Sequence, residues 1–327
     1  MSNASPSHTP DSIASLPAAY VGVIDRIRRK RGFEGASAPT LLRDGWDSVD
    51  LETDGGTSSG LIFRFAKHEA AAQSHAVEAH LLPFLRGHVT PAVPLPEPYA
   101  TEQDGLPHGV LVQVRLAGSP LRAAVIDERN VERLARQIAQ FLVELHDFPA
   151  ERAQALGASG PRQWRGGYEA MRAAVVPALR RRLAISEYAK VRRWWSDFLT
   201  DDQAWSFTPV PVHRNLVAEN LLVDAEARAI TGVIGWGEVA VGDAAADFVG
   251  LVDSYGPDVT WRVTEAYLEH GSSVDGTFLR RVRRLSAATP FTAIQRALVY
   301  PEEGETSATE STIDEAIAWL RSGPILS

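Results

Sequence analysis

The polar side chains that could do chemistry lie close together between His213 and Asp247. Asn215 and Asn220 precede a short apolar run at residues 221–223. Glu238 follows a second apolar run at residues 233–234. A carboxylate can accept a proton or bind magnesium, whereas a carboxamide cannot take up a proton at neutral pH. This stretch is therefore the candidate site, and Asn215 cannot act in it as a general base.

Composition excludes several other classes of site. The 327 residues include no cysteine, which rules out disulfides, thiolate catalysis and Cys-bound zinc. The histidines form no metal-ligand spacing, such as two histidines four apart around an acid, so zinc is not expected. A formal net charge of -8 has the wrong sign for a partner of nucleic acid or of an anionic membrane. The oligomeric state is not predicted.

The N-terminus carries no targeting signal that the sequence makes visible. It lacks the basic start and the apolar stretch of a signal peptide, and no apolar segment of membrane-spanning length follows. We therefore expect a cytoplasmic protein. Residues 1–16 are rich in Ser, Pro and Asn and are predicted to form a disordered tail.

The elements that must position the site change in kind along the chain. Two hairpins are predicted in the first third, over residues 49–66 and 97–115, with a helix over 69–85 between them. In the second strand, alternation puts Arg64 on one face and two phenylalanines on the other. Helices dominate after residue 118, interrupted by short strands near the candidate site. We expect a β-rich lobe over 17–115, a helical lobe over 116–327 and a cleft where they join.

Tryptophans are concentrated in the predicted helical lobe. They are interpreted as aromatic core, and the alternative is that some line a bulky apolar ligand pocket. The four residues concerned are Trp164, Trp194, Trp195 and Trp205.

A resemblance to a known family rests on three ordered blocks. The chain reads His213-Arg214-Asn215-Leu216, then Gly232-Val233-Ile234-Gly235-Trp236, then Asp243-Ala244-Ala245-Ala246-Asp247-Phe248. It resembles the aminoglycoside phosphotransferase family, most of all the macrolide phosphotransferases, which read His-Gly-Asp-Leu, Gly-Val-Ile-Asp-Trp and Asp-Pro-Ala-x-Asp-Phe. The resemblance covers residues 38–320. It implies an α+β, two-lobed, protein-kinase-like fold with a small antiparallel β lobe and a larger helical lobe.

The resemblance also assigns roles, and the chain departs from two of them. In the family, one carboxylate orients the accepting hydroxyl and receives its proton, and a second carboxylate with an asparagine holds magnesium. Here Asn215 occupies the first acid position and Gly235 the second, while Asn220 matches the metal-binding amide. Arg214 replaces a glycine. His213, Arg214 and Asn215 thus form a degenerate equivalent of the catalytic loop, and magnesium is doubtful.

Four further residues near the loop are interpreted individually. Glu238 lies three residues after Gly235 and is either a substitute metal ligand or, as we prefer, a structural acid. Arg214 either enters the cleft, where its guanidinium could bind phosphate, or lies on the surface. Asp243 and Asp247 are expected to anchor the loop or a helix start rather than to act in catalysis.

The resemblance places a nucleotide site on the β-rich lobe. Arg64 stands where the family has its strand basic residue, with Glu78 on the next helix as its expected partner. The pair either braces a nucleotide phosphate or is a purely structural tie. Gln113 and Val114 are expected to offer backbone groups to the purine of ATP or GTP, if either nucleotide binds.

The loss of both acids predicts a degenerate phosphotransferase-like protein that does not carry out normal Mg-ATP phosphoryl transfer. Such a protein would bind a small molecule in the cleft between the lobes. It could also perform repurposed chemistry there, for example in natural-product biosynthesis. The alternative is an active ATP- or GTP-dependent O-phosphotransferase of the antibiotic-modifying type, in which another acid supplies the missing carboxylate.

Overall fold

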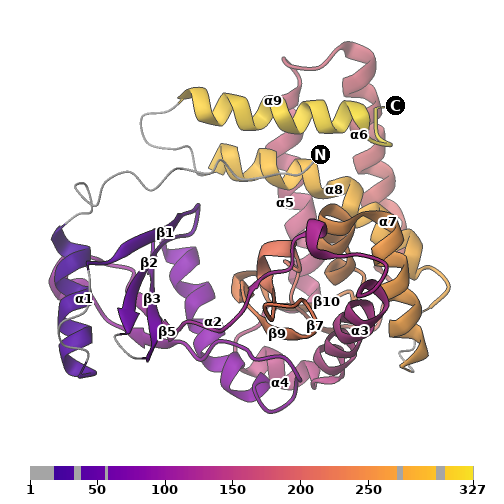
Figure 1. Cartoon of the computed structure of the whole chain (residues 1–327). Coiled ribbons are helices and arrows are strands. Elements are labelled where there is room, and N and C mark those ends of the chain that lie inside the picture. Colours follow the sequence, from indigo (N-terminus) through magenta and orange to yellow (C-terminus); the bar gives the residue numbers. More distant parts are fainter. Residues whose placement is uncertain (1–17, 33–37, 56–57, 271–274, 300–305, 327) are drawn as a thin grey trace.

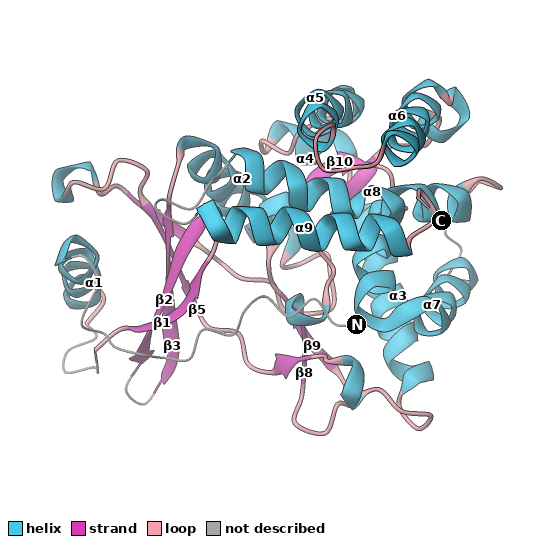
Figure 2. Cartoon of the chain, turned by 90° about the horizontal axis from the view of Figure 1, so that it is seen from above, coloured by secondary structure: helices cyan, strands magenta, loops and turns pink. Residues whose placement is uncertain are grey.

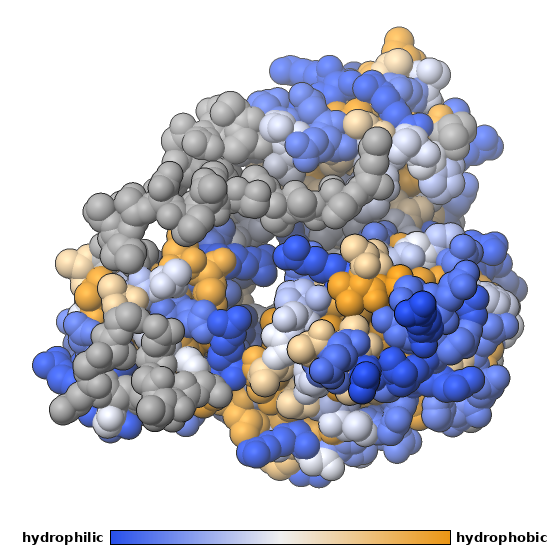
Figure 3. All heavy atoms as spheres, in the orientation of Figure 1, coloured by the Kyte–Doolittle hydropathy of each residue, from blue (hydrophilic) through white to orange (hydrophobic). Residues whose placement is uncertain are grey.

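The computed structural model describes residues 18–32, 38–55, 58–270, 275–299 and 306–326. The predicted disordered tail lies outside these residues. A five-stranded sheet formed by the first third of the chain lies beside a larger, mostly helical region formed by the remainder (Figure 1). In the space-filling view, an opening separates the sheet from the helical region (Figure 3).

The five-stranded sheet is antiparallel, and its strands lie in the order β1-β2-β3-β5-β4. Both predicted hairpins are confirmed: β2 pairs with β3, and β4 pairs with β5. The strands are β1 (Thr40–Asp44), β2 (Ser48–Gly55), β3 (Ser58–Ala66), β4 (Glu97–Tyr99) and β5 (Val110–Val114).

Two helices lie on opposite faces of this sheet (Figure 2). Helix α1 (Ala18–Lys30) packs Ile24 and Ile27 against Phe63 and Phe65 of β3, all of them at most 1% exposed. Burying each such side chain stabilises the fold by about 1.5–3 kcal/mol. The other face carries Arg64, as the alternation predicted, and is met by helix α2 (Glu69–Leu85). That polar face is turned toward the helical region.

The helical region contains the predicted helices and several short strands. Its helices are α3 (Val131–Asp147), α4 (Ala150–Ala155), α5 (Pro161–Leu179), α6 (Ile185–Thr200), α7 (Ala246–Glu269), α8 (Phe278–Val299) and α9 (Thr306–Ser322). Its strands are β6 (Ser119–Pro120), β7 (Val210–Val212), β8 (Leu221–Val223), β9 (Ile230–Val233) and β10 (Ala240–Gly242). Strands β6, β8 and β9 form one small sheet, and β7 with β10 forms another.

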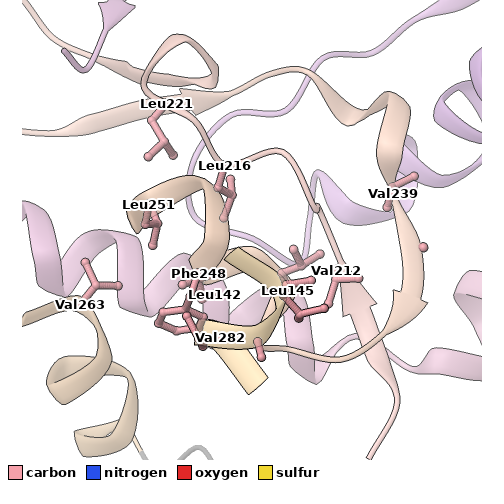
Figure 4. Packing of buried hydrophobic residues seen from close by; sticks show 14 of the residues in the cluster. Leu142, Leu145, Val212, Leu216, Leu221, Val239, Phe248, Leu251, Val263 and Val282 are labelled. Atoms are coloured by element: carbon pink, nitrogen blue, oxygen red, sulfur yellow. The ribbon is translucent and has the colours of Figure 1, made fainter. Parts of the chain in front are cut away.

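One apolar core fixes these short strands against the helices. Helix α3 places Leu142 and Leu145 on a single buried face, because residues three and four apart share a helix side. They pack with Val212 at the end of β7 and with Phe248 at the start of α7 (Figure 4). The loops that begin and end at β7, β8 and β9 are thereby held on a rigid base.

The tryptophans join this core, as expected. Trp195 is completely buried and packs against Phe198 and Phe291, and Trp164 is 7% exposed. None of the described helices combines the length and apolarity needed to span a bilayer.

Candidate functional site

The loop that follows β7 is anchored by Asp247, at the start of α7. This fully buried carboxylate accepts the backbone N–H of His213 at 3.1 Å and that of Arg214 at 2.5 Å. It also contacts Nε2 of His146, on α3, at 3.0 Å. One side chain thus satisfies two successive amides that no strand or helix pairs, which confirms the expectation that Asp247 is a loop anchor.

His213 joins the loop to the chain at the end of β9, and its ring proton is engaged by a backbone carbonyl. Its Nδ1 accepts the N–H of Asn215 at 3.2 Å, so the ring proton resides on Nε2 and is donated to the carbonyl of Ile234 at 3.0 Å. Burial lowers the pKa of His213 to about 4, against the opposing charge of Asp247. The imidazole is therefore neutral near pH 7, and its role is to hold the loop.

Arg214 adopts a backbone conformation that suits glycine. Its φ is +66°, in the left-handed region. Its guanidinium carbon lies 4.7 Å from the centre of the Trp164 ring, and Nη1 lies 3.7 Å from Oε2 of Glu238. The side chain is 35% exposed. It therefore lies along the loop toward α5 and Glu238, and part of it remains exposed to solvent.

Asn220 and Gly235 are in direct contact. Nδ2 of Asn220 donates to the backbone carbonyl of Asn215 at 2.8 Å. Gly235 has a φ of +80°, and a Cβ built there would lie 2.4–2.6 Å from the Nδ2, Cγ and Oδ1 atoms of Asn220. The amide side chain therefore occupies the volume in which a side chain at position 235 would begin.

Glu238 is engaged by two arginines. Its Oε1 accepts a hydrogen bond from Arg296 on α8, and its Oε2 faces Arg214. Burial raises the pKa of this carboxyl, but the charges of Arg214 and Arg296 outweigh that effect and leave the pKa below its ordinary value. This geometry favours the interpretation of Glu238 as a structural acid.

The residues at the expected metal position do not fit a magnesium ion. Mg²⁺ is held in proteins mainly by one or two carboxylates, with near-octahedral oxygen ligands. Here the two side chains available are amides, position 235 has no side chain, and Glu238 is already ion-paired. Within the described ranges there is no cluster of three or more His, Asp or Glu residues suited to a metal.

The wall of the cleft formed by the sheet carries a buried ion pair. Nη1 of Arg64 lies 2.5 Å from Oε2 of Glu78, whose side chain is 1% exposed, and Asp50 lies 3.9 Å away. Burial lowers the pKa of Arg64, but Glu78 and Asp50 outweigh it and the net shift is upward. The two residues that sequence reasoning paired are therefore in contact.

Helix α2 links this wall to the loop after β9. The hydroxyl of Ser74 donates to the carbonyl of Gly237 at 2.5 Å. Gly237 lies in the short helical turn η6 (Trp236–Glu238), which begins directly after Gly235. Ser74 precedes Glu78 by one helical turn on the same face, which is the sequence signal that could have identified it.

The backbones of the two expected hinge residues face opposite edges of β5. Backbone groups alternate sides along an antiparallel strand. The N–H of Arg115 donates to Gly60 of β3, and Gln113 pairs with Ile62 of the same strand, so the backbone of Gln113 faces β3. The N–H and C=O of Val114 face the opposite edge, beyond Val112, which is the last residue of β5 that pairs with β4. Of the two residues, Val114 has its backbone groups turned away from β3.

Asp243 anchors the helical side of the site. Its buried carboxylate contacts Nε of Arg281 at 2.7 Å and accepts the N–H of Ala245 at 3.1 Å. Arg281 is held in turn by Asp275. Both oxygens of Asp243 are therefore engaged within the protein, which agrees with the structural role expected for this residue.

Two contacts at the site were not predicted from the sequence. Trp164 comes from α5 and Arg296 from α8, and both meet residues of the loops from a distance of more than 45 positions along the chain. No local pattern marks either residue, because each contact depends on how the helices pack.

The chain is similar in sequence to known proteins over most of its length. A model of the phosphotransferase enzyme family matches residues 39–308. Viomycin phosphotransferase of Streptomyces vinaceus is 31% identical over 255 residues, which cover 74% of this chain and 81% of the relative. The uncharacterized protein YcbJ of Bacillus subtilis is 24% identical over 253 residues, covering 74% and 78%.

Solved structures show the same architecture. The GDP and kanamycin complex of APH(2")-IIia superposes with a TM-score of 0.78 at 22% identity, covering 92% of this chain and 98% of the other. Macrolide 2'-phosphotransferase MphH of Brachybacterium faecium gives a TM-score of 0.68 at 22% identity, covering 90% and 97%. The predicted α+β, two-lobed, protein-kinase-like fold is confirmed.

Proposed function

Because the chain belongs to the phosphotransferase enzyme family, we propose that it is a degenerate member of that family. It binds a small molecule in the cleft between the sheet and the helical region, and it does not carry out Mg-ATP phosphoryl transfer. The observation that carries this proposal is the contact between Asn220 and Gly235, which fills the metal-ligand position with an amide.

The chemistry of phosphoryl transfer explains why this contact matters. The protein contributes mainly positioning and electrostatic stabilisation, since the metal ions neutralise the charge that develops on the phosphates. Asn215 can orient a hydroxyl but cannot receive its proton. Loss of a general base lowers the rate about 100-fold to 10,000-fold. A site that lacks both the base and a metal carboxylate loses two independent contributions.

Glu238 does not replace the missing carboxylate. A magnesium ion would have to displace Arg296 from Oε1 and overcome the charge of Arg214 beside Oε2. Two guanidinium groups repel a divalent cation at this distance. These contacts support a site that favours anions over cations.

The direct test is a phosphoryl-transfer assay with radiolabelled ATP and GTP, with magnesium and a panel of antibiotic alcohols that includes viomycin and kanamycin. We expect no transfer above the uncatalysed background. The variant Asn215→Asp/Gly235→Asp is the matched comparison, because it restores both acids on the same scaffold. Transfer by the unmodified protein at rates ordinary for kinases, about 1–100 per second, would refute the proposal.

A second candidate function is an active ATP- or GTP-dependent small-molecule O-phosphotransferase with an atypical site. The observation that favours it is the buried pair of Arg64 and Glu78, with the free backbone groups of Val114 on the same wall. These features suit a nucleotide. The two candidates differ in their dependence on magnesium, because only the second requires the metal.

A further inference from the structure

Two arginines from separate elements face one carboxylate beside the Asn215 loop. Arg296 donates to Oε1 of Glu238, and Arg214 lies 3.7 Å from Oε2. Asp243 is already paired with Arg281 at 2.7 Å, and the carboxylate of Asp247 is turned to the backbone amides of the loop. The two guanidinium groups therefore share the single side-chain carboxylate of Glu238. Both arginine side chains are partly exposed, so a ligand can reach them.

The guanidinium of Arg214 is held in place without being satisfied. It carries five N–H donors, and within the described part of the chain it makes no hydrogen bond. It lies over the ring of Trp164, which is itself fixed against β10. A Cβ at Gly242 would come within 2.2–2.8 Å of three atoms of that ring. The donors of Arg214 are thus positioned before any ligand arrives.

The backbone of Arg214 is strained to achieve this position. For a residue with a side chain, a φ of +66° costs roughly 1–2 kcal/mol relative to an ordinary conformation. The carboxylate of Asp247, which binds the two successive amides, keeps the loop in this shape. Strain maintained by surrounding contacts beside a cleft is consistent with a functional demand on the residue.

We propose that Arg214 and Arg296 form an anion-binding subsite that takes a small molecule carrying a carboxylate or phosphate group on a flat, apolar body. The inference rests on the proposed function, that the cleft binds a small molecule. In the ligand-free protein Glu238 occupies the place of the ligand anion. When the ligand binds, its oxygens accept the free N–H groups of Arg214.

The chemistry of the surroundings selects this ligand class. The planar fork of a guanidinium matches the two oxygens of a carboxylate or phosphate. Tyr168 follows Trp164 by one turn of α5, and its ring lies 5.1 Å from that of Phe198. Aromatic walls suit a flat ligand body. A polyamine such as kanamycin would bring ammonium groups toward the two guanidinium groups.

The test is calorimetric titration of the full chain with phenyl phosphate, benzoate, phenol and kanamycin, without magnesium or nucleotide. We expect phenyl phosphate or benzoate to bind at least ten-fold more tightly than phenol and kanamycin. Tighter binding of phenyl phosphate would identify a phosphate ligand, and tighter binding of benzoate a carboxylate. Arg214→Gly removes the guanidinium and relieves the backbone, so it is expected to fold and to bind the anions at least ten-fold more weakly.

Arg172→Ala is the matched control, because it removes one exposed arginine of α5 with no contact to the loop. It is expected to bind the anions like the unmodified protein. The inference is overturned if neither anion binds, if phenol or kanamycin binds as tightly, or if Arg214→Gly retains full affinity. Such results leave the proposed function standing, since that proposal fails only through magnesium-dependent phosphoryl transfer.

Discussion

The side-chain amide of Asn220 rests on the Cα of Gly235, and a Cβ at position 235 would lie 2.4 Å from Nδ2. The same amide donates to the carbonyl of Asn215 at 2.8 Å. The residues at the two missing-acid positions are therefore joined through a single asparagine. Because glycine is what allows this contact, the loss of the acid and the position of the amide form one arrangement.

Substituting Gly235 by alanine should destabilise the fold. The new Cβ meets the Asn220 amide, and the alanine must adopt a φ of +80°, which costs about 1–2 kcal/mol. Displacing the amide breaks its hydrogen bond to the carbonyl of Asn215, which adds about 1 kcal/mol. Chemical denaturation measures the free energy of unfolding. Gly237→Ala is the control, because its Cβ would meet only Ser74 and Glu78 atoms at 3.4 and 3.7 Å. Equal stability of the two variants would disprove the contact.

The pair of Arg64 and Glu78 should behave as a buried ion pair. Glu78→Gln leaves a buried guanidinium without its main partner and should cost about 3–5 kcal/mol, whereas Arg64→Met/Glu78→Leu should cost less than that single change. A double-mutant cycle measures the coupling free energy by urea denaturation of Arg64→Met, Glu78→Leu and the double variant. The half-exposed pair of Arg26 and Asp104 is the comparison, and Asp104→Asn should cost less than about 1 kcal/mol. A coupling free energy near zero for Arg64 and Glu78 would contradict the geometry.

The buried His213 should make stability fall as the pH is lowered. Its pKa is about 4 in the folded protein and near 6.5 when unfolded, so between these values the unfolded chain binds the additional proton. The stability is fully present above pH 6.5 and is lost progressively toward pH 4, by roughly 3 kcal/mol. His75, whose pKa is lowered to about 3 by burial and by Arg64, adds a slope of the same sign.

The variant His213→Asn separates the contribution of His213 to the pH dependence of stability from that of His75. Its free energy of unfolding, measured by denaturation at several pH values, should depend less steeply on pH than that of the unmodified protein. His80→Asn, at an exposed position on α2, should keep the original slope. An unchanged slope in His213→Asn would show that this imidazole takes up its proton equally in both states.

Sequence patterns predicted the elements that depend on local periodicity. Alternation over β3 placed Arg64 opposite the buried Phe63 and Phe65, and the spacing of apolar residues located the helices. Resemblance supplied the pairing of Arg64 with Glu78 and the anchoring role of Asp247. The first contact lies within one hairpin-helix unit, and the second joins two of the motifs that carry the resemblance.

Other features of the site required the packed structure. Which of Gln113 and Val114 offers its backbone depends on the register of β5 with β3, and a shift of one residue would exchange them. The direction of Arg214 depends on Trp164 and Glu238, which reach it from α5 and from the loop after β9. Neither the register nor the packing is encoded in a short window of sequence.

The most direct measurement of the central claim is the magnesium dependence of nucleotide binding, by calorimetric titration of ATP and GTP with and without Mg²⁺. The account predicts that magnesium does not strengthen binding, because Asn220, Gly235 and Glu238 leave no carboxylate free to hold the ion. Affinity that rises ten-fold or more on adding magnesium, and that is lost in Asn220→Ala, would contradict it.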